Sequence, residues 1–174
     1  TDPSYAGQIV TMTAPEMGNY GVAPDDVESG TPRVAGFVVR EESPIASNWR
    51  ADGTLRDYLT RHKIVAISGI DTRALVLHLR SRGVMRGVLS AKGTRAAKLV
   101  QRAKDSPSMA GLDLATRVST RERYQWDQPA VICSPSDLTA KPAPSRFHVV
   151  AYDFGIKRNI LRCLVQTGSR VTVV

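Results

Sequence analysis

The strongest constraint on the fold lies in residues 147–174, where an apolar run, FHVVAYDFG, ends in Asp153, Phe154 and Gly155. A helical pattern follows in IKRNILRCLVQTG and ends at Gly168, before a second apolar run, RVTVV. Two apolar strands joined by a helix require a right-handed crossover in a parallel sheet. We therefore expect a doubly wound α/β domain to begin at about Phe147 with its first β-α-β unit.

The preceding part of the chain mixes short strand patterns with amphipathic helical patterns. The runs GQIVTMT and RVAGFVVR are separated by loops dense in Gly, Pro and Asp, and IVAISGI and MRGVLS indicate two further strands. Helices are predicted at residues 55–63, 72–82 and 94–104, the second between an N-cap at Asp71 and a stop at Gly83. The fold class predicted for residues 1–146 is thus a β-rich mixed α/β domain.

A stretch rich in proline separates the two predicted domains. Residues 128–146, QPAVICSPSDLTAKPAPSR, contain four prolines. We interpret this stretch as a linker. The predicted domains are therefore 1–146, ending in the linker, and 147–174.

Both ends of the sequence suggest that it is a piece of a longer polypeptide. The first residue is Thr1 rather than Met, and Val171–Val174 have the composition of a strand. No apolar run approaches the roughly 20 residues needed to cross a bilayer, and the first residues lack the features of a leader peptide. We expect a cytoplasmic protein that has no membrane partner.

The cysteines and the charges narrow the possible functions. Cys133 and Cys163 have no metal-binding spacing and are predicted to be a loop thiol and a helix-core thiol, so no metal site is expected. Residues 71–174 carry 18 basic and 7 acidic side chains, which would suit an acidic partner or nucleic acid. The aromatic residues of a base-stacking surface are not interleaved with these charges, so solvated helix faces or an acidic protein partner are favoured.

The Asp153-Phe154-Gly155 motif allows more than one interpretation. A protein kinase would also need a Gly-rich loop, a strand lysine and an HRD motif, and this sequence has none of them. A dinucleotide site would need GxGxxG, but the corresponding segment, GIKRN, has a single glycine. The simpler interpretation is that Gly155 makes a tight turn and Asp153 ends a strand. Because ligands of doubly wound sheets bind at such strand ends, Asp153 and Gly155 are candidate residues near a site.

Three long segments resemble the small subunit of carbamoyl-phosphate synthetase in the same order and spacing. They are TDPSYAGQIVTMTAPEMGNYGV, SNWRADGTLRDYLTRHKIVAISGIDTRAL and HVVAYDFGIKRNILR. The resemblance implies a first domain that packs on a large synthetase subunit, followed by a class I glutamine amidotransferase domain. In that family a cysteine thiolate attacks glutamine, a histidine is the general base, and a glutamate orients the histidine. The released ammonia passes to the large subunit, which uses ATP and Mg to make carbamoyl phosphate for pyrimidine and arginine synthesis.

The same resemblance limits which residues can be assigned. The Cys-Leu-Gly-His and His-Pro-Glu motifs of the family do not occur here, so we expect no catalytic residue in this sequence and no glutaminase activity from it alone. The residue types of TDPSY predict on their own a local turn, with Asp2 and Ser4 bonding nearby backbone groups. By resemblance, Ser4 also matches the position that contacts bound glutamine in the family. Residues 153–159 match the start of the second domain, without a catalytic role.

The cofactor and partner expectations follow from the same comparison. We expect no cofactor in this chain, because ATP and Mg belong to the large subunit. The expected partners are that subunit and glutamine, with no nucleic acid. Two alternatives are a non-catalytic basic module that docks an acidic partner or nucleic acid, and an amidotransferase that serves another acceptor.

Overall fold

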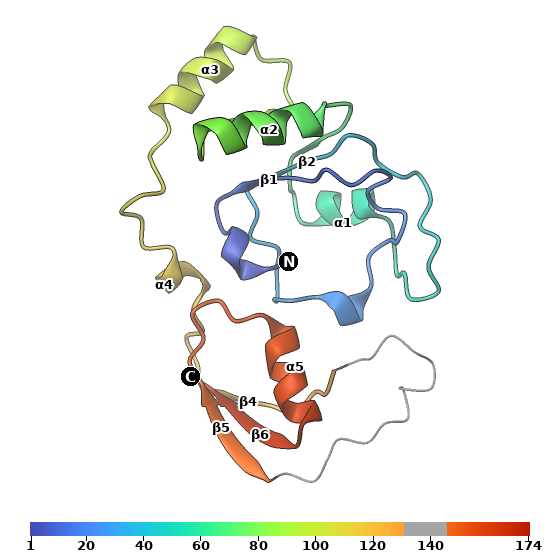
Figure 1. The fold of residues 1–174 in the computed structure, drawn as a ribbon, viewed down its shortest axis with the longest axis vertical. Coiled ribbons are helices and arrows are strands. Elements are labelled where there is room, and N and C mark those ends of the chain that lie inside the picture. The colour runs from blue at the N-terminus through green and yellow to red at the C-terminus, as the bar shows by residue number, and fades with distance from the viewer. Residues whose placement is uncertain (131–145) are drawn as a thin grey trace. The chain divides into compact units, whose positions relative to one another are not determined.

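A computed structural model describes residues 1–130 and 146–174 of the chain (Figure 1). These residues form two compact units, and each unit is discontinuous in sequence. Unit 1 contains Thr1–Ser4, Asp25–Pro32 and Asp113–Val174, and unit 2 contains Tyr5–Pro24 and Arg33–Leu112. Within the described residues, no helix is both long and apolar enough to cross a membrane.

Unit 2 contains a parallel sheet of three short strands. They are β1 (Ile9–Thr11), β2 (Gly36–Val38) and β3 (Ala66–Ile67), in the order β1-β2-β3. The central strand β2 is followed by Val39, and both Val38 and Val39 are buried. The predicted strands in GQIVTMT, RVAGFVVR and IVAISGI are therefore confirmed.

The helices of unit 2 begin and end close to where their capping residues predict. Helix α1 spans Leu55–Arg61 and is capped by Thr54, whose hydroxyl accepts a hydrogen bond from the Asp57 N–H. Helix α2 spans Thr72–Arg82. The Asp71 carboxylate caps its start by accepting a hydrogen bond from the Ala74 N–H at 3.0 Å, and the helix stops at Gly83, whose φ is 82°. Helix α3 spans Ala96–Asp105.

Two expectations for this part of the chain are corrected. Residues 85–90, MRGVLS, form no strand, because no neighbouring strand pairs with their backbone; Leu89 instead packs its side chain against Gly36. The mixed α/β character is confirmed, but the β-rich character is not, since α1–α3 cover more residues than β1–β3 in the described part of unit 2. Loops rich in Gly and Pro keep the strands to two or three residues.

Unit 1 contains the predicted β-α-β arrangement. Strand β5 (Phe147–Ala151) pairs in parallel with β6 (Ser169–Val173), and helix α5 (Arg158–Gln166) connects them. The core of this unit consists of Leu161 and Val165 from α5 against Val171 and Val173 from β6. Helix α5 packs on one face of the sheet (Figure 1), and the right-handedness of the crossover stays a prediction.

A third strand makes the sheet of unit 1 mixed. Strand β4 (Tyr124–Trp126) pairs antiparallel with β6, so the order is β4-β6-β5. Tyr124 and Trp126 are half-buried against the core, while Gln125 lies on the opposite face, where Thr172 accepts hydrogen bonds from its amide at 3.2 Å. The short helix α4 (Ala115–Val118) and the 3-10 turns η1 (Pro3–Tyr5) and η2 (Pro24–Asp26) complete the described elements.

The predicted domain division does not coincide with the two compact units. The linker prediction for residues 128–146 and the loop thiol at Cys133 fall largely or wholly on residues 131–145, outside the described residues. The boundary between 146 and 147 stays a prediction.

The prediction for Cys163 is wrong: its side chain is exposed, because the buried stripe of α5 passes through Leu161 and Val165 on another face of the helix.

Candidate functional site

The turn after β5 is held by the side chain of Asp153. Its Oδ1 accepts hydrogen bonds from the backbone N–H groups of Gly155 and Ile156, each at 2.8 Å. The Asp153 N–H in turn donates to the Val174 carbonyl at 2.8 Å. The carboxylate therefore fixes the path of the chain from β5 into α5, at the carboxyl end of the strand where ligands of such sheets bind.

Gly155 is required in this turn for two independent reasons. Its φ of 95° lies in the left-handed region, which side chains with a Cβ rarely adopt. A Cβ placed on it would also lie 2.8 Å from Cγ2 of Val118 and 3.2 Å from Cβ of Pro3. The second contact shows that the first residues of the chain pack directly against this turn.

Ser4 is held next to Asp2 by a local turn. The Asp2 carboxylate accepts hydrogen bonds from both the backbone N–H of Ser4, at 2.9 Å, and the Ser4 hydroxyl. This arrangement is the turn that the Asp2 and Ser4 residue types predict, so that prediction is confirmed. The Ser4 hydroxyl is exposed and keeps a fixed position beside a carboxylate.

Asp2 also joins this turn to the start of α5. Its Oδ2 forms an ion pair with Nζ of Lys157 at 2.7 Å, and the Asp2 side chain is 16% exposed. Partial burial alone would raise the pKa of Asp2, but hydrogen bonds from Lys157 and Ser4 outweigh it and lower the pKa to about 2. Asp2 is therefore a permanent anion at neutral pH.

A second N-terminal segment caps α5 from a distance. Lys157, the N-cap residue of α5, forms no capping hydrogen bond with its side chain. Instead, the Glu28 carboxylate accepts from the Asn159 N–H at 2.9 Å, and the Glu28 carbonyl accepts from the Arg158 N–H at 3.1 Å. Two of the N–H groups that every helix leaves without an internal partner are thus satisfied by residues 25–32.

Arg162 and Trp126 extend these contacts along the helix. The buried Arg162 guanidinium donates to the Val27 carbonyl at 3.1 Å. The Arg158 guanidinium lies 5.9 Å from the centre of the Trp126 ring, a cation–π contact. We call Asp2, Glu28, Lys157, Asn159 and Arg162 the α5 clamp.

The clamp and the neighbouring Asp153 turn hold the backbone in place and are poorly suited to acid–base chemistry. Asp2, Glu28 and Asp153 all accept hydrogen bonds from fixed donors. Burial and the Asp153 carboxylate raise the pKa of the neighbouring Tyr124 phenol, and the Arg158 guanidinium lowers it by a smaller amount. The net shift is upward, so this phenol stays protonated at neutral pH. The described residues contain no cluster of His, Cys, Asp and Glu that could hold a metal ion.

The structure brings the three candidate residues into one unit, although it does not test their roles. Ser4 follows Pro3, and Pro3 touches the Gly155 turn that Asp153 stabilises. Sequence reasoning missed Glu28, Lys157 and Arg162, because their local sequence patterns do not predict which residue, more than a hundred positions away, each one contacts. Asp2 was recognised only as a turn residue.

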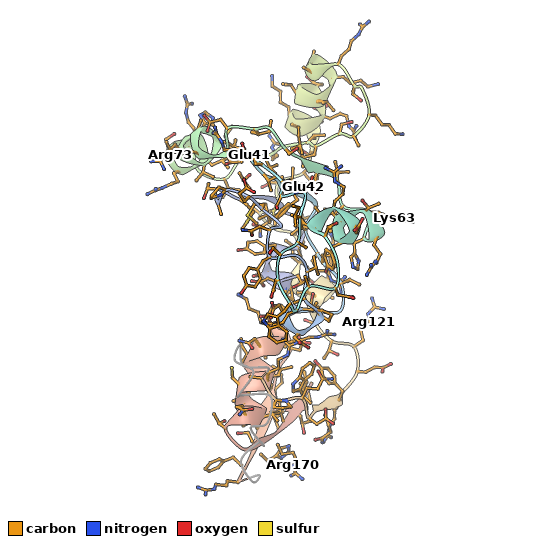
Figure 2. The ribbon with its side chains drawn as sticks, turned by 90° about the vertical axis from the view of Figure 1, so that its right-hand side faces the viewer. Glu41, Glu42, Lys63, Arg73, Arg121 and Arg170 are labelled. Carbon is orange, nitrogen blue, oxygen red and sulfur yellow. The ribbon has the colours of Figure 1, made fainter. Side chains whose placement is uncertain are left out.

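Unit 2 contains a separate half-open cavity of about 280 Å³ between α1 and β3. Its lining is polar and apolar in similar measure, and the apolar side chains include Leu55, Leu59 and Ile64. Glu42, labelled in Figure 2, and Arg56 also line it and form an ion pair with each other. These two charges pair with each other, and Thr60 and Ser68 supply the rest of the polar lining.

Comparison with known proteins points to one family. The family model for the carbamoyl-phosphate synthase small chain, CPSase domain, matches residues 1–89. The chain is 51% identical to the carbamoyl phosphate synthase small chain of Syntrophotalea carbinolica and 49% identical to that of Nitratidesulfovibrio vulgaris strain Hildenborough. It is 48% identical to the corresponding protein of Parasynechococcus marenigrum.

These matches extend over the whole of this chain but not over the whole of the relatives. All 174 residues are covered in each comparison, whereas the matched part is 46%, 47% and 45% of the three relatives. The chain therefore spans just under half the length of the curated relatives it matches.

Proposed function

This chain belongs to the carbamoyl-phosphate synthase small-chain family, and we propose that it is part of the subunit that hydrolyses glutamine and supplies ammonia to a large synthetase subunit. The acceptor reaction forms carbamoyl phosphate from ammonia, bicarbonate and ATP. The large subunit binds the ATP and Mg, and this chain binds no cofactor of its own.

The chemistry explains why the two activities would be coupled between subunits. Ammonia released into water at neutral pH is largely protonated, and ammonium has no lone pair with which to attack a carbonyl. A route inside the protein keeps the ammonia unprotonated until it reaches the acceptor. The small subunit therefore has to dock on the large one to be productive.

The contact between Pro3 and the Gly155 turn is the observation that best supports this function. It carries Ser4 to the carboxyl end of β5, and that edge is where a doubly wound amidotransferase domain would bind its substrate. In this proposal, β5, α5 and β6 are the first elements of that domain, and Asp153 and Gly155 shape its edge without taking part in catalysis.

Ser4 is proposed to contact the bound glutamine. Its hydroxyl donates to Asp2, and the hydroxyl oxygen, which has two lone pairs, can accept a hydrogen bond from the α-ammonium group of the substrate. The Asp2 carboxylate accepts the hydroxyl hydrogen of Ser4 and so orients this oxygen. The Ser4–Asp2 pair would thus recognise the amino-acid end of glutamine rather than its amide.

The decisive experiment uses the complete small subunit together with its large subunit. We expect carbamoyl phosphate to form with glutamine as the nitrogen donor, and also with ammonium salts when the large subunit is present alone. Glutamine hydrolysis without carbamoyl phosphate would contradict the proposal and favour an amidotransferase for another acceptor. A complete subunit that hydrolyses no glutamine in the complex would contradict it as well.

The remaining parts of the proposal concern the setting of the enzyme. We propose a cytoplasmic heterodimer that feeds pyrimidine and arginine synthesis. Growth of a strain lacking this gene should then depend on added uracil and arginine.

A further inference from the structure

The entire net charge of the chain is concentrated in one continuous stretch. Residues 72–105 contain nine basic side chains and one acidic side chain, Asp105, whereas the rest of the chain contains 15 of each sign. This cationic segment consists of α2, the connection over residues 83–95, and α3, all within unit 2. Its basic residues are Arg73, Arg80, Arg82, Arg86, Lys92, Arg95, Lys98, Arg102 and Lys104.

These nine cations are exposed, and the described residues do not neutralise them. None of them forms an ion pair within the part of the chain that the structure describes, and only Arg86 has a hydrogen bond to another segment, to the Ser106 carbonyl at 2.7 Å. Figure 2 labels Arg73 on α2, where nitrogen-tipped side chains extend outward. Uncompensated charge of one sign costs self-repulsion, so its concentration here requires an explanation.

Helix α3 shows this cost locally. Arg95 occupies the N-cap position without forming a capping bond, no acidic residue lies in the first turn, and Lys98 lies there instead. Cations near a helix N-terminus oppose the helix dipole, and Lys98 and Arg102, four residues apart, repel each other. Carboxylates supplied by another molecule would relieve both effects.

Aliphatic side chains are interleaved with the cations. Arg73, Leu77 and Arg80 follow one another along one face of α2, with Leu77 53% exposed. Val84 is 98% exposed just after α2, and Val100 is 54% exposed on α3. Exposed aliphatic groups within a charged surface mark a place where another protein can pack.

The same composition argues against nucleic acid as the partner. Residues 72–105 contain no Phe, Tyr or Trp, so the segment has no ring on which a base could stack. A phosphate backbone would pair with the cations but would leave Leu77, Val84 and Val100 in water. A protein surface can satisfy both kinds of side chain.

We propose that the cationic segment binds an acidic protein surface that also presents apolar side chains. Carboxylates of the partner pair with the cations of α2 and α3, and its apolar side chains cover the exposed aliphatic ones. Such an interface is steered by charge and weakens as salt screens it. This inference does not depend on the glutaminase function proposed above.

The test compares three defined probes by fluorescence anisotropy: a helical peptide of Glu and Leu, polyglutamate of the same length, and a DNA duplex. We expect the Glu/Leu peptide to bind most tightly at physiological salt, and its affinity to fall as salt is raised. The combined change Arg73→Gln, Arg80→Gln and Arg102→Gln should weaken its binding by about tenfold. Leu77→Ser with Val84→Ser should remove the preference for the Glu/Leu peptide over polyglutamate.

The matched control removes the same charge from unit 1, through Arg121→Gln, Arg123→Gln and Arg170→Gln, all three exposed. We expect less than about a twofold change, with unchanged unfolding midpoints for all variants. If Arg73→Gln and Arg80→Gln on α2 unfold the protein, the double change Lys98→Gln with Lys104→Gln on α3 replaces them, and its affinity for the Glu/Leu peptide is compared with the same control. DNA as the tightest ligand, equal binding of both peptides, or an equal loss in the control variant would each overturn the proposal.

Discussion

The carboxylate of Glu28 accepts a hydrogen bond from the backbone N–H of Asn159 at 2.9 Å, across 131 positions of sequence. It links the first thirty residues to the helix of the β-α-β unit. The contact does the work of a helix cap, because α5 has no capping side chain of its own. The stability of α5 is therefore expected to depend on residues far from it in the chain.

Glu28→Ala should destabilise the protein by about 0.5–2 kcal/mol, the range measured for loss of a helix cap. Glu28→Gln should cost less, since the amide oxygen can still accept the hydrogen bond while the charge at the helix N-terminus is lost. Urea denaturation followed by circular dichroism measures both changes. Glu122→Ala, at an exposed site outside the clamp, is the matched control, and an equal effect there would refute the capping role.

The ion pair between Asp2 and Lys157 should make stability depend on acid pH. The pKa of Asp2 is about 2 in the folded protein and 3.8 without such contacts. Because the folded pKa is the lower one, this contribution is complete above about pH 4 and is lost as the pH falls toward 2. Asp2→Asn should flatten the pH profile of the unfolding midpoint in this window, whereas Asp25→Asn should not. Identical profiles for wild type and Asp2→Asn would exclude the ion pair as a source of stability.

Gly155→Ala should destabilise the protein by more than about 1 kcal/mol, because alanine disfavours the left-handed conformation and its Cβ would press on Val118 and Pro3. Gly93→Ala is a suitable control, since a Cβ there meets nothing within 4 Å. Thermal unfolding of the two variants gives the comparison. A tolerated Gly155→Ala would mean that the turn can relax without the glycine.

Ser4→Ala tests the proposed contact with glutamine. In the complete small subunit bound to its large subunit, we expect KM for glutamine to rise about two- to tenfold, the effect of one hydrogen bond of about 0.5–1.5 kcal/mol. Activity with ammonium salts should not change, and it serves as the internal control. An unchanged KM would leave Ser4 with the local turn as its only role.

The polypeptide of this sequence alone should release no ammonia from glutamine above background. Cys163 is exposed on α5 and has no hydrogen-bonded histidine among the described residues, since His148 bonds to Thr172 instead. Cys163→Ser should accordingly leave the glutaminase activity of the complete subunit unchanged. A large loss of activity would show that this thiol takes part in the reaction.

Local patterns predicted the elements that depend on neighbouring residues. Asp71 and Gly83 bound α2 as expected, and the apolar runs around α5 form parallel strands. The strand predictions failed where a strand needs a pairing partner or is very short. MRGVLS has a strand composition but no strand to pair with, and β4 was missed because a three-residue strand shows little periodicity.

The candidate site was predictable only in part for the same reason. Asp153 and Gly155 could be placed at a strand end from their own motif, and the Asp2–Ser4 turn from its residue types. The clamp could not be found, because a charge such as Glu28 does not specify from sequence which distant N–H group it will bond. Long-range pairing of this kind is set by the packed structure.

The discontinuity of unit 1 has a consequence for how a ribosome makes this protein. Glu28 leaves the exit tunnel long before Asn159 is translated. At about 5–20 residues per second, the separation of 131 positions takes on the order of ten seconds to translate. During that interval the Glu28 carboxylate and the first four residues have no helix to hold. Slow translation would lengthen this waiting time, so codon usage upstream of α5 can affect the yield of correctly assembled chains.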